Sequence, residues 1–95
     1  MYRLYYLVEV YHALGRKAES DATLAEYMEF HGDSAYQVAC LHALRGEPDE
    51  AFRWLDRAYA QRDITLMFLK SDVDLKSLRG DRRWLPFLRK MRLAD

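Results

Sequence analysis

The amino-acid sequence predicts an all-helical fold of two antiparallel helical hairpins followed by short capping helices. Apolar residues recur at spacings of three and four along most of the chain, as on one face of a helix. Glycines divide the chain into segments of helical length, and a pattern of residues repeats after 31 positions. With 95 residues, the chain is expected to form one structural domain, with hairpins over residues 1–31 and 32–62 and a helical cap over 63–95.

The first hairpin is predicted from two amphipathic segments on either side of Gly15. The first helix has one apolar face, made by Leu4, Leu7, Val8 and Tyr11. Gly15 should end it, because glycine reaches the left-handed cap conformation without strain. A second helix is expected from Ala18 to His31, with Gly32 or Asp33 at its end.

The second hairpin follows the same plan around Gly46. A helix is expected from Ser34 to Arg45, with Ser34 or Asp33 as a side-chain N-cap. The next helix has the clearest start in the sequence, since Pro48 suits the first helical position and two acids follow it in the first turn.

The last third of the chain has a different pattern. A short apolar run covers Ile64 to Leu69, and Asp74 to Leu78 predicts one or two turns of helix. Asp81 is a candidate cap for a final helix. Pro86 should either kink that helix or place its start near Leu85, because proline clashes with the preceding turn.

An internal repeat relates the two hairpins. A shift of 31 residues brings Tyr5 onto Tyr36, Gly15 onto Gly46, Glu19 onto Glu50 and Leu24 onto Leu55. A shift of 30 matches His12-Ala13-Leu14 to His42-Ala43-Leu44 but breaks the glycine register, so 31 is preferred. One hairpin cannot bury both of its faces, and repeats of this kind therefore stack.

At these positions the chain resembles the tetratricopeptide repeat (TPR) family. The second hairpin carries the family pattern at Val38, Ala39, His42, Gly46, Ala51, Leu55 and Ala58. In the first hairpin Leu4, Leu7, Tyr11, Gly15 and Leu24 match, whereas Val8, Ser20 and Tyr27 stand where small apolar residues are usual. The resemblance implies a TPR-like α-solenoid whose first helices line a concave groove.

A second resemblance covers about 60 residues, from Ala35 to Leu93. It is similar to the C-terminal TPR region of bacterial multidomain signalling and regulatory proteins, through the stretches 35–39, 51–55, 58–63, 69–72, 78–81 and 88–91. Val73 and Arg82 stand where prolines commonly follow the aspartates in such proteins. This resemblance implies that the chain is a C-terminal fragment of a larger protein.

Composition narrows the partners that we expect. Lysine plus arginine and aspartate plus glutamate are both 15, so the net charge is zero, whereas nucleic-acid binders are usually basic. Cys40 is the single cysteine, which rules out an intramolecular disulfide and fits a reducing compartment. No apolar run is long enough to span a membrane or reads as a signal peptide. We therefore expect a cytoplasmic protein that binds neither nucleic acid nor membranes.

The expected partner-binding residues line the groove that the resemblance implies. They are Tyr2, Tyr5, Glu9, His12, Tyr36 and Cys40. Tyrosines are enriched at the centres of protein interfaces, because they bring a large contact area at low entropic cost. The expected partner is a protein or peptide, or an upstream domain of the same chain. Two alternatives stay open: Tyr2, Tyr5 and Tyr6 could pack against a preceding hairpin, or the first helix could form a homodimer.

No catalytic, cofactor-binding or metal site is expected. The histidines are His12, His31 and His42, and neither His12 nor His42 has a carboxylate at ligand spacing. His42, two residues from Cys40 on a helix, points elsewhere. The basic residues between Arg79 and Arg92 are best explained as the solvated face of an end helix. The sequence therefore predicts a protein-interaction or scaffolding module rather than an enzyme. The alternative is a regulatory tail of a bacterial signalling enzyme or transcription regulator that senses a small ligand.

Overall fold

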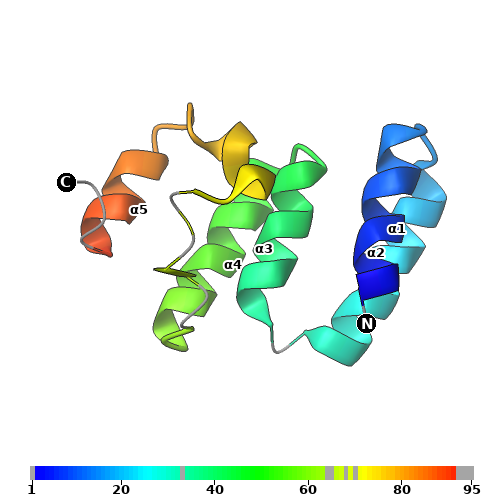
Figure 1. Cartoon of the computed structure of the whole chain (residues 1–95), viewed down its shortest axis with the longest axis horizontal. Coiled ribbons are helices and arrows are strands. Elements are labelled where there is room, and N and C mark those ends of the chain that lie inside the picture. The colour runs from blue at the N-terminus through cyan, green and yellow to red at the C-terminus, as the bar shows by residue number, and fades with distance from the viewer. Residues whose placement is uncertain (1, 33, 64–65, 68, 70, 92–95) are drawn as a thin grey trace.

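A computed structural model describes residues 2–32, 34–63, 66–67, 69 and 71–91, and over these residues the chain is helical without any strand. This confirms the all-helical class. The helices are α1 (Tyr2–Ala13), α2 (Lys17–His31), α3 (Ala35–Leu44), α4 (Pro48–Ala60), the 3-10 helix η2 (Val73–Leu78) and α5 (Trp84–Lys90). Figure 1 shows α1 beside α2 at one end, α3 beside α4 in the middle and α5 at the other end.

The two hairpins turn by the same backbone device, 31 residues apart. Gly15 and Gly46 have φ of 74° and 72°, a left-handed conformation that favours glycine. After each glycine, an amide reaches back five residues, from Arg16 to Tyr11 and from Glu47 to His42, both at 2.9 Å. These bonds make the Schellman motif, which satisfies carbonyls at the helix end. The two turns of the 31-residue repeat therefore share the same backbone conformation and hydrogen bonds.

Small residues lie buried where the helices of each hairpin pack. In the second hairpin Ala39 and Ala51 are fully buried. In the first hairpin Ser20 takes the place of Ala51, and its hydroxyl donates to the carbonyl of Val8 at 3.1 Å. Because its one polar group is paired, the serine can be buried there without a large penalty.

The starts of the helices differ in detail from the sequence predictions. Ser34 is the N-cap residue of α3, but its side chain makes no capping hydrogen bond, so the predicted side-chain cap is wrong for Ser34. Asp33, the other candidate, lies outside the described residues. The helix α4 begins at Pro48 with Asp49 and Glu50 in its first turn, as its sequence predicts.

The chain after α4 returns over the second hairpin. The 3-10 helix η2 packs against α3, with Leu75 and Leu78 buried. Next, α5 packs beside α4, where the rings of Tyr59 and Phe87 lie 6.4 Å apart. Pro86 is the third residue of α5, so the helix begins before the proline, at Trp84. Half of the predicted apolar run from Ile64 to Leu69 lies outside the described residues, and of the other half Leu66 and Leu69 are buried.

One hydrophobic core joins both hairpins and the C-terminal segment. Its members come from α1 through α5, and Leu41, Leu55, Leu69, Leu75 and Leu78 are among its most buried side chains. The molecule is elongated, with extents of 39 × 25 × 19 Å. Among the described residues, no helix combines the length and apolar character needed to cross a bilayer.

Candidate functional site

The face of α1 and α3 that was expected to line an open groove is covered by the chain itself. Tyr5 on α1 and both Tyr36 and Cys40 on α3 are buried. The segment that covers them begins at Asp72 and continues into η2. Three of the six predicted partner-binding residues therefore contact this chain's own C-terminal segment and are closed to solvent.

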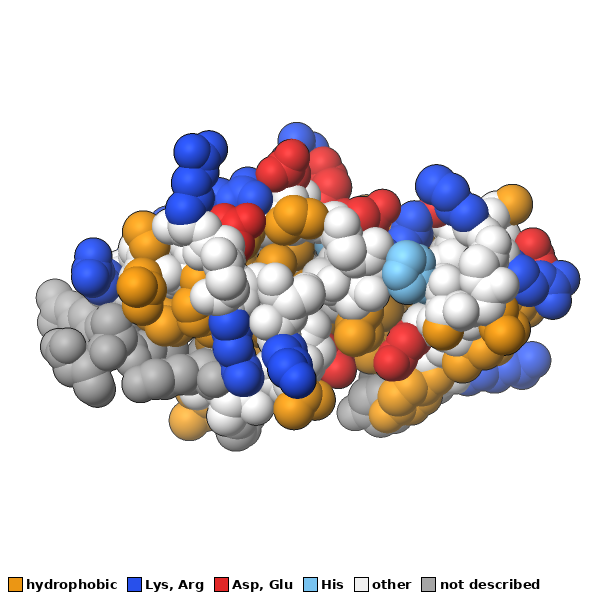
Figure 2. All heavy atoms as spheres, turned by 90° about the horizontal axis from the view of Figure 1, so that it is seen from above, with side chains coloured by type: hydrophobic (Ala, Val, Ile, Leu, Met, Phe, Trp, Pro, Cys, Tyr) orange, Lys and Arg blue, Asp and Glu red, His pale blue; other side chains and the backbone are white. Residues whose placement is uncertain are grey.

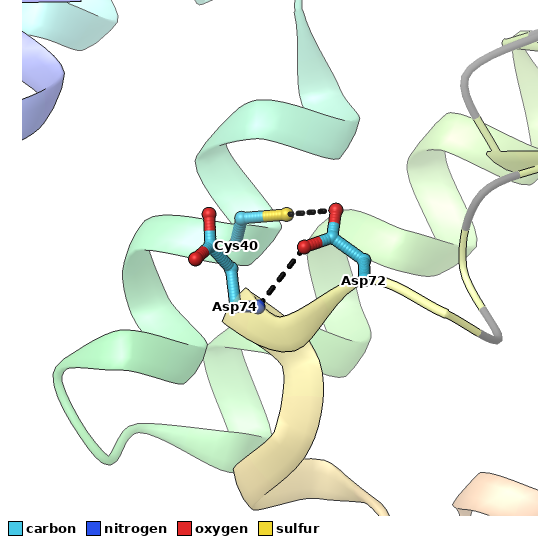
Figure 3. A group of neighbouring side chains, drawn as sticks. All are labelled: Cys40, Asp72 and Asp74. Carbon is cyan, nitrogen blue, oxygen red and sulfur yellow. Dashed lines mark hydrogen bonds between the residues drawn. The ribbon is translucent and has the colours of Figure 1, made fainter.

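Two aspartates anchor that segment. The Tyr36 hydroxyl donates to Oδ2 of Asp72 at 2.7 Å, and the Tyr5 hydroxyl donates to Oδ2 of Asp74 at 2.7 Å. The Cys40 thiol points to the same Asp72 oxygen at 3.9 Å, and the backbone amide of Asp74 donates to Asp72 Oδ1 at 2.9 Å. Figure 3 shows Cys40 on α3 facing Asp72 and Asp74 at the start of η2.

A further hydrogen bond fastens the other end of η2. The Ser77 hydroxyl donates to the carbonyl of Ala43 at 3.0 Å. Between the two ends, Leu75 is fully buried, whereas Val73 is 75% exposed. The segment thus directs its aspartates and leucines inward and Val73 outward. We call residues 71–78 the covering segment.

The surroundings keep the buried donors protonated. Burial raises the pKa of both tyrosines and of the Cys40 thiol. The neighbouring Asp72 raises all three further, and Asp74 adds to the rise for Tyr5 and Cys40. A tyrosine with a raised pKa remains a hydrogen-bond donor at neutral pH. The electrostatics therefore favour the observed direction of donation, from hydroxyl to carboxylate.

Cys40, Asp72 and Asp74 also form a group whose donor atoms lie within 4.8 Å of one another. A cysteine binds metal as its thiolate, and here the pKa of the thiol is raised rather than lowered. Asp72 already accepts hydrogen bonds at both oxygens, and Asp74 accepts one from Tyr5. The chemistry of the group is that of a hydrogen-bonded anchor, and we propose no metal for it.

The other predicted site residues lie elsewhere. Glu9 and His12 are exposed on α1, and the side chain of Tyr2 lies outside the described set. His12 lines a hollow of about 240 Å³ beside the two glycine turns, together with Gly15, Lys17, Arg45 and Glu47. The structure therefore does not bring Glu9 or His12 to the anchored aspartates.

A charged network ties the hairpins together next to this hollow. Nδ1 of His42 lies 2.9 Å from Glu47, and Arg45 contacts both Glu47, at 3.3 Å, and Asp21 of α2. Hydrogen bonds from Lys17 and Arg45 lower the pKa of the Asp21 carboxyl. His42 is buried and its ring faces the Glu47 carboxylate, so the prediction that His42 has no carboxylate near it is wrong.

Some of the basic C-terminal residues make contacts within the molecule. Arg83 contacts Asp81 and Asp49 and lies over the ring of Phe52, 4.7 Å from its centroid. Its bonds lower the pKa of Asp81 to about 2. Lys90 lies 4.4 Å from the centroid of the Tyr59 ring. These contacts favour a structural role for Arg83 and Lys90, which fasten α5 to α4.

The outer face of α1 carries an exposed apolar set that the sequence predictions include only in part, through Tyr6 and the alternative of a homodimer. Tyr6, Val10 and Leu14 are 58%, 48% and 64% exposed and follow one another at intervals of four residues. This spacing puts them in one stripe along the helix, and the amide of Leu14 still donates to the carbonyl of Val10. Figure 2 shows hydrophobic side chains at the surface of this end of the molecule. The same spacing is present in the sequence, but the set of Leu4, Leu7, Val8 and Tyr11 predicts one apolar face, on the other side of the helix.

Comparison of the chain with family models, with curated proteins and with solved structures finds no significant match.

Proposed function

We propose that the chain is a protein-interaction module built from TPR-like hairpins and that it binds its partner through the outer face of α1. The repeated glycine turns and the buried Ala39 and Ala51 support the TPR-like arrangement. The observation that carries the binding proposal is the stripe of Tyr6, Val10 and Leu14. Exposed apolar side chains that adjoin one another on a rigid element are typical of protein-binding surfaces.

The covering segment supports this choice of face. Tyr5, Tyr36 and Cys40 are occupied within the molecule, so the surface that remains for a partner is the opposite side of α1. Glu9 is exposed on the same helix, three residues after Tyr6, and belongs to the rim of that surface, whereas His12 points to the hollow beside Arg45 and Glu47. In this proposal polar residues surround an apolar centre, as in many protein interfaces.

Site-specific photo-crosslinking in cells tests the proposal. A photoreactive phenylalanine analogue in place of Tyr6 should capture a protein, because the side chain is exposed and its replacement is also aromatic. The same analogue at Arg53, which is exposed on α4, is the matched control. Capture at both positions alike, or at neither, would argue against binding through α1. Mass spectrometry of the product also tells a second copy from a different protein.

A second candidate function is the sensing of a small ligand. A hollow of about 830 Å³ lies between the end of α4 and the C-terminal segment, lined by Tyr59, Ala60, Arg62, Asp63, Leu66, Met67 and Met91. Its mixed apolar and charged lining suits a small organic molecule with a polar group. A rise in melting temperature with a compound from a metabolite panel, lost in Leu66→Ala, would favour this function. No rise across the panel would favour the interaction module.

A further inference from the structure

The exposed stripe of α1 has a counterpart in the second hairpin, where the equivalent residues are covered by another part of the molecule. The shift of 31 residues relates Tyr6, Val10 and Leu14 to Gln37, Leu41 and Arg45 of the α3 region. Leu41 is fully buried, and the side chain of Arg45 is only 6% exposed.

The first hairpin packs on this part of the second hairpin. Arg45 reaches Asp21 of α2, and α1 packs against α3. In this molecule, then, the outer face of one hairpin is closed by another helical hairpin of the same kind. The outer face of α1 is the corresponding place where that contact is not made within the chain.

From this we infer that a second copy of the chain covers the outer face of α1, by pairing of the two α1 helices around a twofold axis near Val10. This inference rests on the proposed function and names its partner. Tyr6 and Leu14 lie four residues on either side of Val10, so two antiparallel helices would bring Tyr6 of one copy against Leu14 of the other. A stripe of this symmetry is complementary to itself, as an isologous interface requires.

Charge is compatible with such a pair. The chain carries no net charge, so two copies do not repel each other at long range. The stripe and its neighbours Leu7 and Ala13 carry no charge, and the exposed Arg3 and Glu9, of opposite sign, lie three residues before and after Tyr6. Beside the stripe, a hollow of about 540 Å³ between α1 and α2 offers room for a side chain of the second copy. It is lined by Arg3, Leu4, Leu7 and Tyr11 of α1 and by Thr23, Glu26 and His31 of α2.

The other end of the molecule does not offer the same face. There the chain is closed by η2 and α5. Charged residues are exposed on η2 (Lys76), on α5 (Arg89) and between them (Arg79 and Arg82), and they stand beside the single exposed apolar side chains Val73 and Leu85. Pairing of like ends closes after two copies, whereas head-to-tail stacking would continue without limit. The inference is therefore a closed dimer.

Sedimentation velocity of the full chain between about 1 and about 300 µM tests it, because small interfaces dissociate in this range. We expect a reversible monomer–dimer equilibrium. Val10→Glu and Val10→Lys should each weaken it at least tenfold, since like charges would meet at the axis. An equimolar mixture of the two variants should dimerise again. Circular dichroism checks that the variants stay folded, and Val73→Glu, at another exposed apolar side chain, should dimerise as the wild type does.

Three results would overturn the inference. They are a wild-type chain that is monomeric throughout the range, Val10 variants that dimerise normally, and association that continues past the dimer. A monomeric chain that still crosslinks a different protein from position 6 would refute the dimer and leave the proposed interaction function standing.

Discussion

At the scale of single residues, Tyr5 and Tyr36 have the clearest task, which is to hold the covering segment on α1 and α3. Each hydroxyl bonds one aspartate, and the partners are 69 and 36 residues away along the chain. These bonds join the first helix of each hairpin to the same C-terminal segment. Because both acceptors are carboxylates, the bonds are stronger than bonds between neutral groups.

Replacing either tyrosine with phenylalanine should destabilise the protein. Tyr5→Phe and Tyr36→Phe each remove a donor to a carboxylate, and we expect each to lower the free energy of unfolding by about 1–3 kcal/mol. Urea titration measures this. Tyr59→Phe, at a half-exposed ring, is the control and should change stability by less than about 0.5 kcal/mol. Equal effects at all three positions would show that the bonds to Asp72 and Asp74 contribute nothing.

The same residues predict how stability depends on pH. Burial raises the pKa of Cys40, Tyr5 and Tyr36 in the folded chain, whereas the unfolded chain ionises them near pH 8.5 and about 10. Their contribution is complete below about pH 8, where both states are protonated. It is lost as pH rises above these unfolded values, because the unfolded state then releases protons first.

Urea midpoints measured between about pH 7 and about pH 11 should therefore fall in the alkaline part of the range. The double variant with Tyr5→Phe and Tyr36→Phe should have a lower urea midpoint at neutral pH. Its midpoint should fall less steeply with pH, because it lacks two of the three ionisable groups whose pKa is raised. Parallel curves for the two proteins would contradict the assigned cause.

At the scale of elements, the chain is most predictable where structure is local. The left-handed glycines of both turns, the start of α4 at Pro48 and the 31-residue register all follow from residues that are neighbours in sequence. The burial of Tyr5 and Tyr36 could not be predicted in this way. It depends on Asp72 and Asp74, and nothing in the first hairpin indicates which later segment returns to it. The side chain of Ser34 makes no capping hydrogen bond either, because a suitable residue type at a helix start does not ensure that the bond forms.

Alanine substitutions can test whether the left-handed backbone of the two glycine turns matters for stability, with Gly80 as the control. Gly15→Ala and Gly46→Ala place a side chain at positive φ, and each should cost about 1–2 kcal/mol of stability. A Cβ would meet no atom within 4 Å at either glycine, so the cost comes from the backbone alone. Gly80→Ala also meets nothing but lacks the positive φ, and it should be neutral or slightly stabilising. Thermal unfolding compares the three; a loss at Gly80 equal to the others would exclude the backbone cause.

At the scale of the whole molecule, the first hairpin depends on the rest through few contacts. In the rest of the molecule α3 packs closely on α4 and η2, and Leu55, Leu69 and Leu75 are fully buried, whereas the junction with α2 includes the polar contact of Arg45 with Asp21. We therefore expect the molecule to open first between α2 and α3. Such local opening is ordinary where few buried contacts hold an element.

Hydrogen exchange can locate that opening. Arg45→Met removes a buried guanidinium that contacts Asp21 and Glu47, and amides of α2 should then exchange about tenfold faster, corresponding to ~1.4 kcal/mol. Amides of α4 should be nearly unchanged. Lys17→Met, which removes the other cation on Asp21 but is far more exposed, is the matched control and should have a smaller effect. Faster exchange in both hairpins would mean that they open as one unit.

The covering segment also decides which ligands the first helices can accept. A free peptide that offered aspartates to Tyr5 and Tyr36 would compete with a segment that is covalently attached to the same chain. Attachment gives a segment an effective concentration on the order of millimolar, and Leu75 and Leu78 add buried apolar area to its advantage. Weak acidic peptides would therefore be excluded at ordinary cellular concentrations, and selection for binding would act on the outer surface of α1.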